Sequence, residues 1–139
     1  MAPKISVEEF QAFIEDEIPL VPLFGIRTVA MGRGTATMRM HFNETLIRPG
    51  GTVAGPALMG LADVTLYAVV LGLIGRKELA VTTNLVINFL RKPGPADVIA
   101  EGKILKLGKR LAVGECSLYS IGEEDLVAHV TGTYSIPPE

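Results

Sequence analysis

This chain of 139 residues has one cysteine, a small net charge and no basic run, and each of these features excludes a class of protein. The single cysteine, Cys116, rules out an internal disulfide, and the segment MAPKISVEEF lacks the basic flank and apolar core of a secretory signal. We therefore expect a reducing, cytoplasmic setting. The net charge is only −2 and no basic run occurs, so nucleic acid is not expected as a partner.

Metal ligands and nucleotide motifs are scarce as well. His41 and His129 fall in separate predicted strands without an acid or a cysteine at ligand spacing, so no metal site is predicted. The glycine-rich stretch RPGGTVAGP lacks the GK[ST] ending of a nucleotide-binding loop, and turn chemistry explains Gly50 and Gly51.

Apolar residues make up 48% of the sequence, which is enough for one domain with its own core over residues 1–139. Ser6 and Glu9 form a capping box ahead of an apolar face, which predicts a short amphipathic helix over residues 7–17 that ends before Pro19. We expect this helix to pack on the edge of the domain.

Strand patterns occupy most of the remaining sequence. Alternating residues within 24–42, with glycines near position 33, predict a β-hairpin. Four further strands, separated by short turns, predict an antiparallel meander over residues 80–92, 97–108, 110–120 and 126–137.

A long apolar helix is predicted over residues 56–74, between the hairpin and the four strands. Pro56 suits its first position, where an amide hydrogen has no partner, and Asp63 is its one charged residue. The run is only about 18 residues long and lies within a β-rich sequence, so we expect a buried helix and no membrane partner. The fold class is therefore α+β, with a curved antiparallel sheet around this helix.

Three segments resemble the hotdog-fold thioesterases, and among them the PaaI-like acyl-CoA thioesterases of phenylacetate degradation. They read GTVAGPALMGLAD, TTNLVINFLRKPG and GKILKLGKRLAVGECSLYS, and the resemblance extends over about residues 22–136. It implies a hotdog fold and hydrolysis of an acyl-CoA thioester. It implies no cofactor, because coenzyme A is part of the substrate.

The resemblance also implies site residues. Asp63 matches the acid of the family's Leu-Ala-Asp motif, Gly55 matches the central glycine of its His-Gly-Gly motif, and Thr82 matches a Ser or Thr that orients water in some members. The chain departs from the family at three positions: Ala54 replaces the usual histidine, Pro56 replaces the second glycine, and Arg48 lies where a number of members have asparagine.

Helix geometry predicts that one subunit cannot complete this site. The Gly55 N–H lies at a helix N-terminus, where it can hold the oxyanion formed when a thioester carbonyl is attacked. Asp63 is eight residues further on, about 12 Å along the axis, which is too far to reach that carbonyl. Two antiparallel helices from two subunits would bring the groups together, so we expect at least a homodimer. The sequence leaves open whether two dimers pair into a tetramer.

The role of Asp63 stays open between general base and nucleophile. Arg48 is a candidate counterion, and Tyr67 is a weaker supporting candidate one helical turn from Asp63. In a thioesterase, basic residues near the entrance of the acyl-binding tunnel are expected to bind the phosphates of coenzyme A. Each of these residues also suits an ordinary solvated turn. The expected substrate-binding residues are Arg48, Val53, Ala54, Met59, Tyr67, Arg91, Lys92, Lys109 and Arg110.

Two other functions fit parts of the pattern. A module that binds acyl-CoA without cleaving it would explain Ala54 and Pro56, while a mid-helix Asp63 can also serve structure by pairing with Arg48. An enoyl-CoA hydratase or dehydratase of the same fold would need a histidine beside the acid, and none occurs between His41 and His129. The sequence leaves open the acyl group and the choice between coenzyme A and acyl carrier protein.

Overall fold

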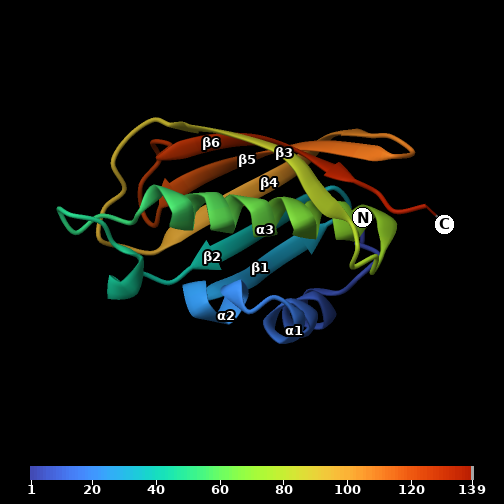
Figure 1. The fold of residues 1–139 in the computed structure, drawn as a ribbon, viewed down its shortest axis with the longest axis horizontal. Coiled ribbons are helices and arrows are strands. Elements are labelled where there is room, and N and C mark those ends of the chain that lie inside the picture. Colours follow the sequence, from blue (N-terminus) through green and yellow to red (C-terminus); the bar gives the residue numbers. More distant parts are fainter. Residues whose placement is uncertain (139) are drawn as a thin grey trace.

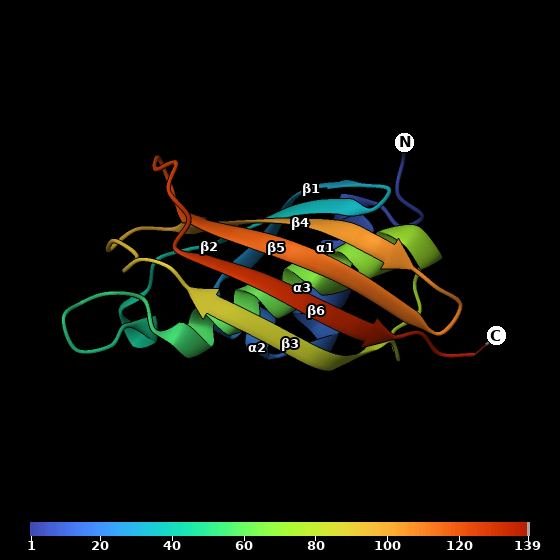
Figure 2. The ribbon, with the colours of Figure 1, turned by 90° about the horizontal axis from the view of Figure 1, so that it is seen from above.

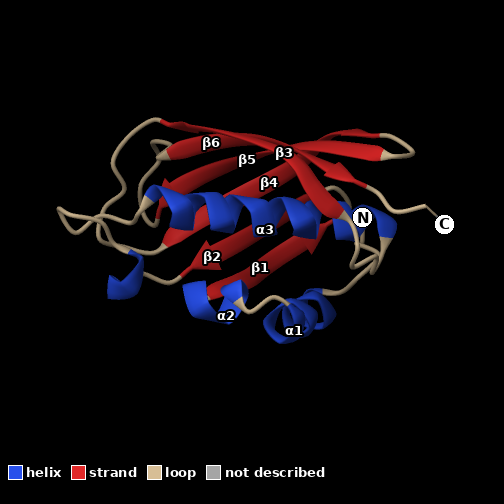
Figure 3. Ribbon diagram, in the orientation of Figure 1, coloured by secondary structure: helices blue, strands red, loops and turns tan. Residues whose placement is uncertain are grey.

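The computed structural model describes residues 1–138, and within them one antiparallel sheet curves around one long helix (Figures 1 and 3). The strand order is β1-β2-β4-β5-β6-β3, and every neighbouring pair is antiparallel. The predicted α+β hotdog fold is therefore confirmed. The elements are α1 (Val7–Glu17), α2 (Leu20–Phe24), β1 (Ile26–Gly32), β2 (Thr35–Met40), a 3-10 turn (Glu44–Leu46), α3 (Gly55–Ile74), β3 (Val81–Phe89), β4 (Val98–Leu107), β5 (Leu111–Ser120) and β6 (Ala128–Ser135).

Helix α3 is the core of the domain and begins one residue before the predicted start. Glycines on the helix-facing side of the sheet allow its close approach. A Cβ atom at Gly102 would lie 3.0 Å from Thr65 and Val69, and one at Gly132 would lie 2.7 Å from Leu66. Side chains at these positions would push the helix away from the sheet.

By length and composition α3 could also cross a bilayer, since its most apolar window has a mean hydropathy of 2.1. However, 72% of that window is buried inside the domain. Burial by the protein's own sheet accounts for the apolar composition, as in the core helix of a globular fold.

Helix α1 covers the end of this core and spans the residues of the predicted N-terminal helix. The Ser6 hydroxyl accepts a hydrogen bond from the Glu9 N–H at 3.1 Å, as the capping box predicts. Phe10 and Phe13 are buried, and their rings lie 6.0 and 6.1 Å from the ring of Tyr67 on α3. The short helix α2, which the sequence did not indicate, continues from α1 and ends at Gly25, whose φ is +67°.

The predicted four-stranded meander is wrong in one respect, because β3 does not pair with β4. Strand β3 lies at the far edge of the sheet, beside β6 (Figure 2), and β4 pairs with β2 instead. The connection over residues 90–97 is no hairpin turn: the Leu90 and Arg91 N–H groups donate to the Val127 carbonyl, and the Gly94 N–H donates to the Ser120 hydroxyl. This connection passes over the ends of β5 and β6 and leads into β4.

Asp97, the last residue of this connection, links the start of β4 to the end of β2 by hydrogen bonds. Its carboxylate accepts hydrogen bonds from the Phe42 N–H at 2.7 Å and from Arg39 Nε and Nη2 at 2.8 and 2.7 Å. Burial alone would raise the pKa of Asp97, but these donors outweigh it and lower the pKa below its usual 3.8. Ionised Asp97 therefore stabilises the folded state.

We expect Asp97→Asn to lower the free energy of unfolding at neutral pH by about 1–3 kcal/mol, since charge-assisted hydrogen bonds are lost. Because the folded-state pKa is depressed, the wild-type advantage is complete above about pH 4 and disappears as the pH falls through the lower folded-state value. Urea unfolding across the acid range measures this difference. Asp125→Asn, which breaks the surface pair with Arg91, is the control and should cost little. A pH-independent difference would contradict the assignment.

Candidate active site

Asp63 lies on α3 with one carboxylate oxygen held by two hydroxyl groups. Thr82 Oγ1 on β3 donates to Asp63 Oδ1 at 2.7 Å, and the Tyr134 hydroxyl on β6 lies 2.6 Å from the same oxygen. The Tyr134 hydroxyl is also 2.8 Å from the main-chain oxygen of Asp63. Within residues 1–138, Asp63 Oδ2 accepts no hydrogen bond, so this oxygen has no protein donor and can accept one from a ligand.

Tyr134 belongs to this site although the sequence did not indicate it. It is the direct cross-strand partner of Thr82 in the β3–β6 pair, and only 4% of it is exposed. Burial and the negative charge of Asp63 raise the pKa of Tyr134, so the phenol stays protonated and acts as a donor. The sequence-based prediction placed β3 beside β4 and therefore did not bring Tyr134 near Thr82. The available signal was that a buried tyrosine hydroxyl needs a hydrogen-bond partner.

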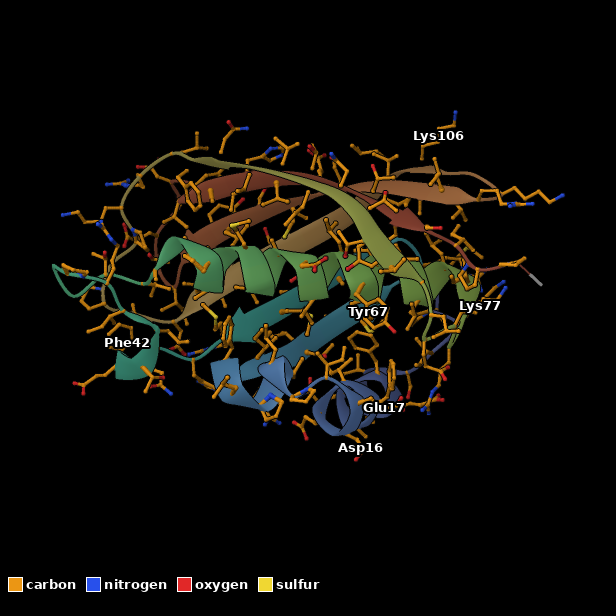
Figure 4. The ribbon with its side chains drawn as sticks, viewed as in Figure 1. Asp16, Glu17, Phe42, Tyr67, Lys77 and Lys106 are labelled. Atoms are coloured by element: carbon orange, nitrogen blue, oxygen red, sulfur yellow. The ribbon has the colours of Figure 1, made fainter. Side chains whose placement is uncertain are left out.

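A cavity of about 220 Å³ opens beside Asp63. Its wall is mostly apolar and comes from the α1–α2 junction, α3, the start of β3 and β6. Tyr67, which points from α3 toward α1 (Figure 4), donates its hydroxyl to the Glu78 carbonyl at 2.9 Å. Burial, with the charges of Glu78 and Glu17 adding to it, raises the pKa of Tyr67 to about 12. The lining residues are Ile18, Leu20, Gly60, Asp63, Val64, Tyr67, Ala80, Val81, Thr82 and Tyr134.

Gly55, at the start of α3, carries the free amide of the first helical turn. Pro56 has no N–H, and the Ala57 and Leu58 N–H groups donate to the Ala54 carbonyl. Within the described residues the Gly55 N–H has no partner. The Phe89 ring lies 3.2 Å from the position that a Cβ of Gly55 would take, so a side chain here would crowd this ring. This end of α3 thus offers a donor with open access.

A second cavity, of about 310 Å³, surrounds Gly55 and has a cationic rim. Arg91 pairs with Asp125 at 2.5 Å, whereas Arg48 and Lys92 have no acidic partner in the part of the chain that the structure describes. Unpaired cations in a cavity favour an anionic ligand. The lining residues are Arg48, Thr52, Val53, Gly55, Leu58, Phe89, Arg91, Lys92 and Pro93.

The remaining predicted residues lie outside both cavities. Ala54 is the N-cap of α3 and donates its N–H to the Leu46 carbonyl. Met59 lies on α3 between the two ends of the site and is 38% exposed. Lys109 and Arg110 are in the turn between β4 and β5, close to Lys106 in the last part of β4 (Figure 4).

The two cavities of one protomer share no lining residue. Asp63 lies in the first, while Gly55 and Arg48 lie in the second, so the chain brings Thr82 and Tyr67 to Asp63 but not the glycine or the arginine. Across residues 1–138 no three His, Cys, Asp or Glu side chains form a group that could hold a metal ion. Asp63 and Gly55 therefore lie in separate cavities at different positions along α3.

Comparison with known proteins agrees with this description. The profile of the thioesterase superfamily matches residues 50–127. A protein of Saccharolobus solfataricus, named as a candidate esterase, is 32% identical in an alignment of 137 positions, which covers 96% of this chain and 87% of that protein. The PaaI protein of the E. coli phenylacetic acid degradation operon shares the fold, with a TM-score of 0.83 at 18% identity, over 95% of this chain and 94% of that one.

A crystal structure from Silicibacter sp. TM1040, named as a candidate thioesterase, is more similar still. It has a TM-score of 0.89 and 43% identity, and the match covers 99% of this chain and 96% of that one. Since the superfamily profile matches more than half of the chain and relatives match it nearly end to end, the chain belongs to the thioesterase superfamily of hotdog-fold proteins.

Proposed function

We propose that this protein hydrolyses an acyl-CoA thioester to a free acid and coenzyme A, in sites that two subunits share. The observation that carries the proposal is the separation along α3 of a carboxylate with one free oxygen from an amide with no partner. Each is half of the machinery that acyl transfer to water requires. Neither half can work alone.

Strand β3 supports a dimer, because it is an unpaired edge with exposed apolar side chains. Val81, Val86 and Phe89 on β3 are 57%, 49% and 55% exposed, and Leu90, directly after the strand, is 56% exposed. A long apolar edge strand invites pairing with another chain, and a second copy of β3 is its natural partner.

The same strand would bring the two half-sites together. Thr82, near the start of β3, is hydrogen-bonded to Asp63, and Phe89, at the end of β3, lies against Gly55. If two β3 strands pair antiparallel about a two-fold axis near Leu85, the start of one strand lies beside the end of the other. Asp63 of one subunit then faces Gly55 of its partner, and the pairing creates two equivalent sites.

In this arrangement the thioester carbonyl accepts a hydrogen bond from the Gly55 N–H of the partner subunit. Asp63 Oδ2 either removes a proton from the attacking water or attacks the carbonyl itself to give a mixed anhydride, which water then opens. In both cases the carbonyl oxygen becomes an oxyanion at the helix N-terminus, and the thiolate of coenzyme A leaves and is protonated. The net reaction consumes one water molecule.

The cations suit the phosphates of coenzyme A. Arg48 and Lys92 rim the Gly55 cavity, and Arg91 lies beside them. Ser135 pairs with both Val81 and Leu111, so Lys109 and Arg110 lie at the β3-start end of the sheet. In the proposed dimer this end adjoins the partner's Gly55 cavity, and both basic groups would face one entrance. The acyl group would then occupy the apolar cavity beside Tyr67, with Met59 between the subunits.

A hydrolysis screen tests the proposal. Short-chain, long-chain and aromatic acyl-CoAs, together with acyl carrier protein thioesters, are incubated with the protein, and released thiol is measured. We expect catalytic thiol release from at least one acyl-CoA. Tight binding of acyl-CoAs that stay intact would instead favour the binding module, for which Ala54 and Pro56 are the sequence evidence. Release only from carrier-protein thioesters would contradict the choice of coenzyme A.

A further inference from the structure

We propose that Tyr134 is a positioning residue, which acts with Thr82 to hold Asp63 Oδ1 and thereby makes Oδ2 the reacting oxygen. The inference rests on the proposed function of Asp63. It adds to that function a residue on a third element of the fold, and it distinguishes the two oxygens of one carboxylate.

The two donors converge on the same oxygen from different strands. Thr82 Oγ1 reaches Asp63 Oδ1 from β3 at 2.7 Å, and the Tyr134 hydroxyl reaches it from β6 at 2.6 Å. A phenol has one proton, and of the two acceptors within reach the carboxylate is stronger than the main-chain carbonyl at 2.8 Å. Two directed hydrogen bonds on Oδ1 oppose rotation of the carboxylate, whereas in the described residues nothing holds Oδ2.

Tyr134 itself has little freedom to move. Its ring stacks on Tyr67, with centroids 6.0 Å apart and planes 24° apart. Tyr67 is fixed in turn by its hydrogen bond to the Glu78 carbonyl and by the rings of Phe10 and Phe13 on α1. The donor on Asp63 is therefore supported by packing that extends to the N-terminal helix, as preorganised sites require.

This arrangement has a kinetic consequence. A carboxylate that can rotate presents its oxygens to the carbonyl or water in many orientations, few of which are productive. Loss of an anchoring donor should thus reduce the rate of the chemical step while substrate binding, which depends on the cavities and cations, stays largely unchanged. The expected signature is a lower kcat at a nearly constant KM.

The test uses Tyr134→Phe, with kcat and KM measured on the best acyl-CoA from the screen. We expect kcat to fall by about 10- to 100-fold with KM changed by less than about twofold. Thr82→Val should act in the same direction, and Thr82→Ser, which keeps the hydroxyl, should retain most of the activity. Tyr119→Phe removes a tyrosine hydroxyl from the outer face of β5 and is the matched control, with wild-type kinetics expected.

A wild-type kcat in folded Tyr134→Phe, or a loss expressed only in KM, would overturn the inference. A purely structural role would lower Tm but leave kcat of the folded protein unchanged, so Tm is measured on each variant. If Tyr134→Phe does not fold, Thr82→Val decides, because it removes the other anchor of the same oxygen. Failure of the underlying function is distinguishable, since it would appear as undiminished activity in Asp63→Asn.

Discussion

Asp63→Asn is expected to lower kcat by about 10²- to 10⁴-fold, the loss typical of removing a general base. The asparagine amide is nearly isosteric, and its oxygen can still accept the hydrogen bonds of Thr82 and Tyr134. The amide nitrogen that replaces Oδ2 can neither take a proton from water nor attack a carbonyl. Chemistry is therefore lost while packing is kept, and thiol release under saturating acyl-CoA measures the effect.

The matching control is Asp16→Asn, which removes a carboxylate of the same kind from the exposed face of α1 (Figure 4). Its kcat should equal that of wild type, and both variants should keep the wild-type Tm and the elution volume on size exclusion. A kcat for Asp63→Asn within a few-fold of wild type would remove Asp63 from the mechanism. Such a result would favour a different nucleophile or a site that does not use this acid.

The second large effect is recovery of activity when two inactive variants assemble together. Gly55→Val should be inactive by itself, because its side chain would fill the space between the helix start and the Phe89 ring. In a heterodimer of Gly55→Val with Asp63→Asn, one site contains both substitutions and the other contains neither. We expect the purified heterodimer to regain about half of the wild-type activity, from nearly none in either homodimer.

This experiment requires the two variants to carry different affinity tags, so that co-expressed heterodimers can be isolated by two purification steps. A heterodimer of Asp16→Asn and wild type, prepared in the same way, controls for handling and should be fully active. Absence of recovery in well-folded heterodimers would mean that Asp63 and Gly55 act within one subunit. A stable monomer with wild-type kcat would contradict the shared site directly.

Local patterns were enough to predict α1 and α3, although not the short helix α2 between them. The capping box at Ser6, the proline at the entry of α3 and the apolar composition of that helix each act over a few residues, and the structure agrees within one residue. The separation of Gly55 from Asp63 followed from the rise of an α-helix alone. The two groups accordingly line different cavities.

The order of strands could not be predicted in the same way. Whether β3 pairs with β4 or with β6 depends on the path of the connection around Pro93 and on contacts made by Asp97, which a strand pattern does not contain. Tyr134 was missed for the same reason, since its link to Asp63 exists only because β6 lies beside β3. The residues that anchor the acid were thus less predictable than the acid itself.

If two copies of β3 pair in the dimer, the register between them sets the distance from Asp63 of one subunit to Gly55 of the other. A slip of two residues between paired β3 strands would keep every side chain on its original face, yet would shift one subunit by about 7 Å along the other. Such a dimer would be folded and apolar surfaces would remain covered, but the carboxylate and the amide would no longer meet at one carbonyl. The register between β3 and β6 shifts between Thr82 and Asn84, and this irregularity is the feature of β3 best placed to disfavour the slipped pairing.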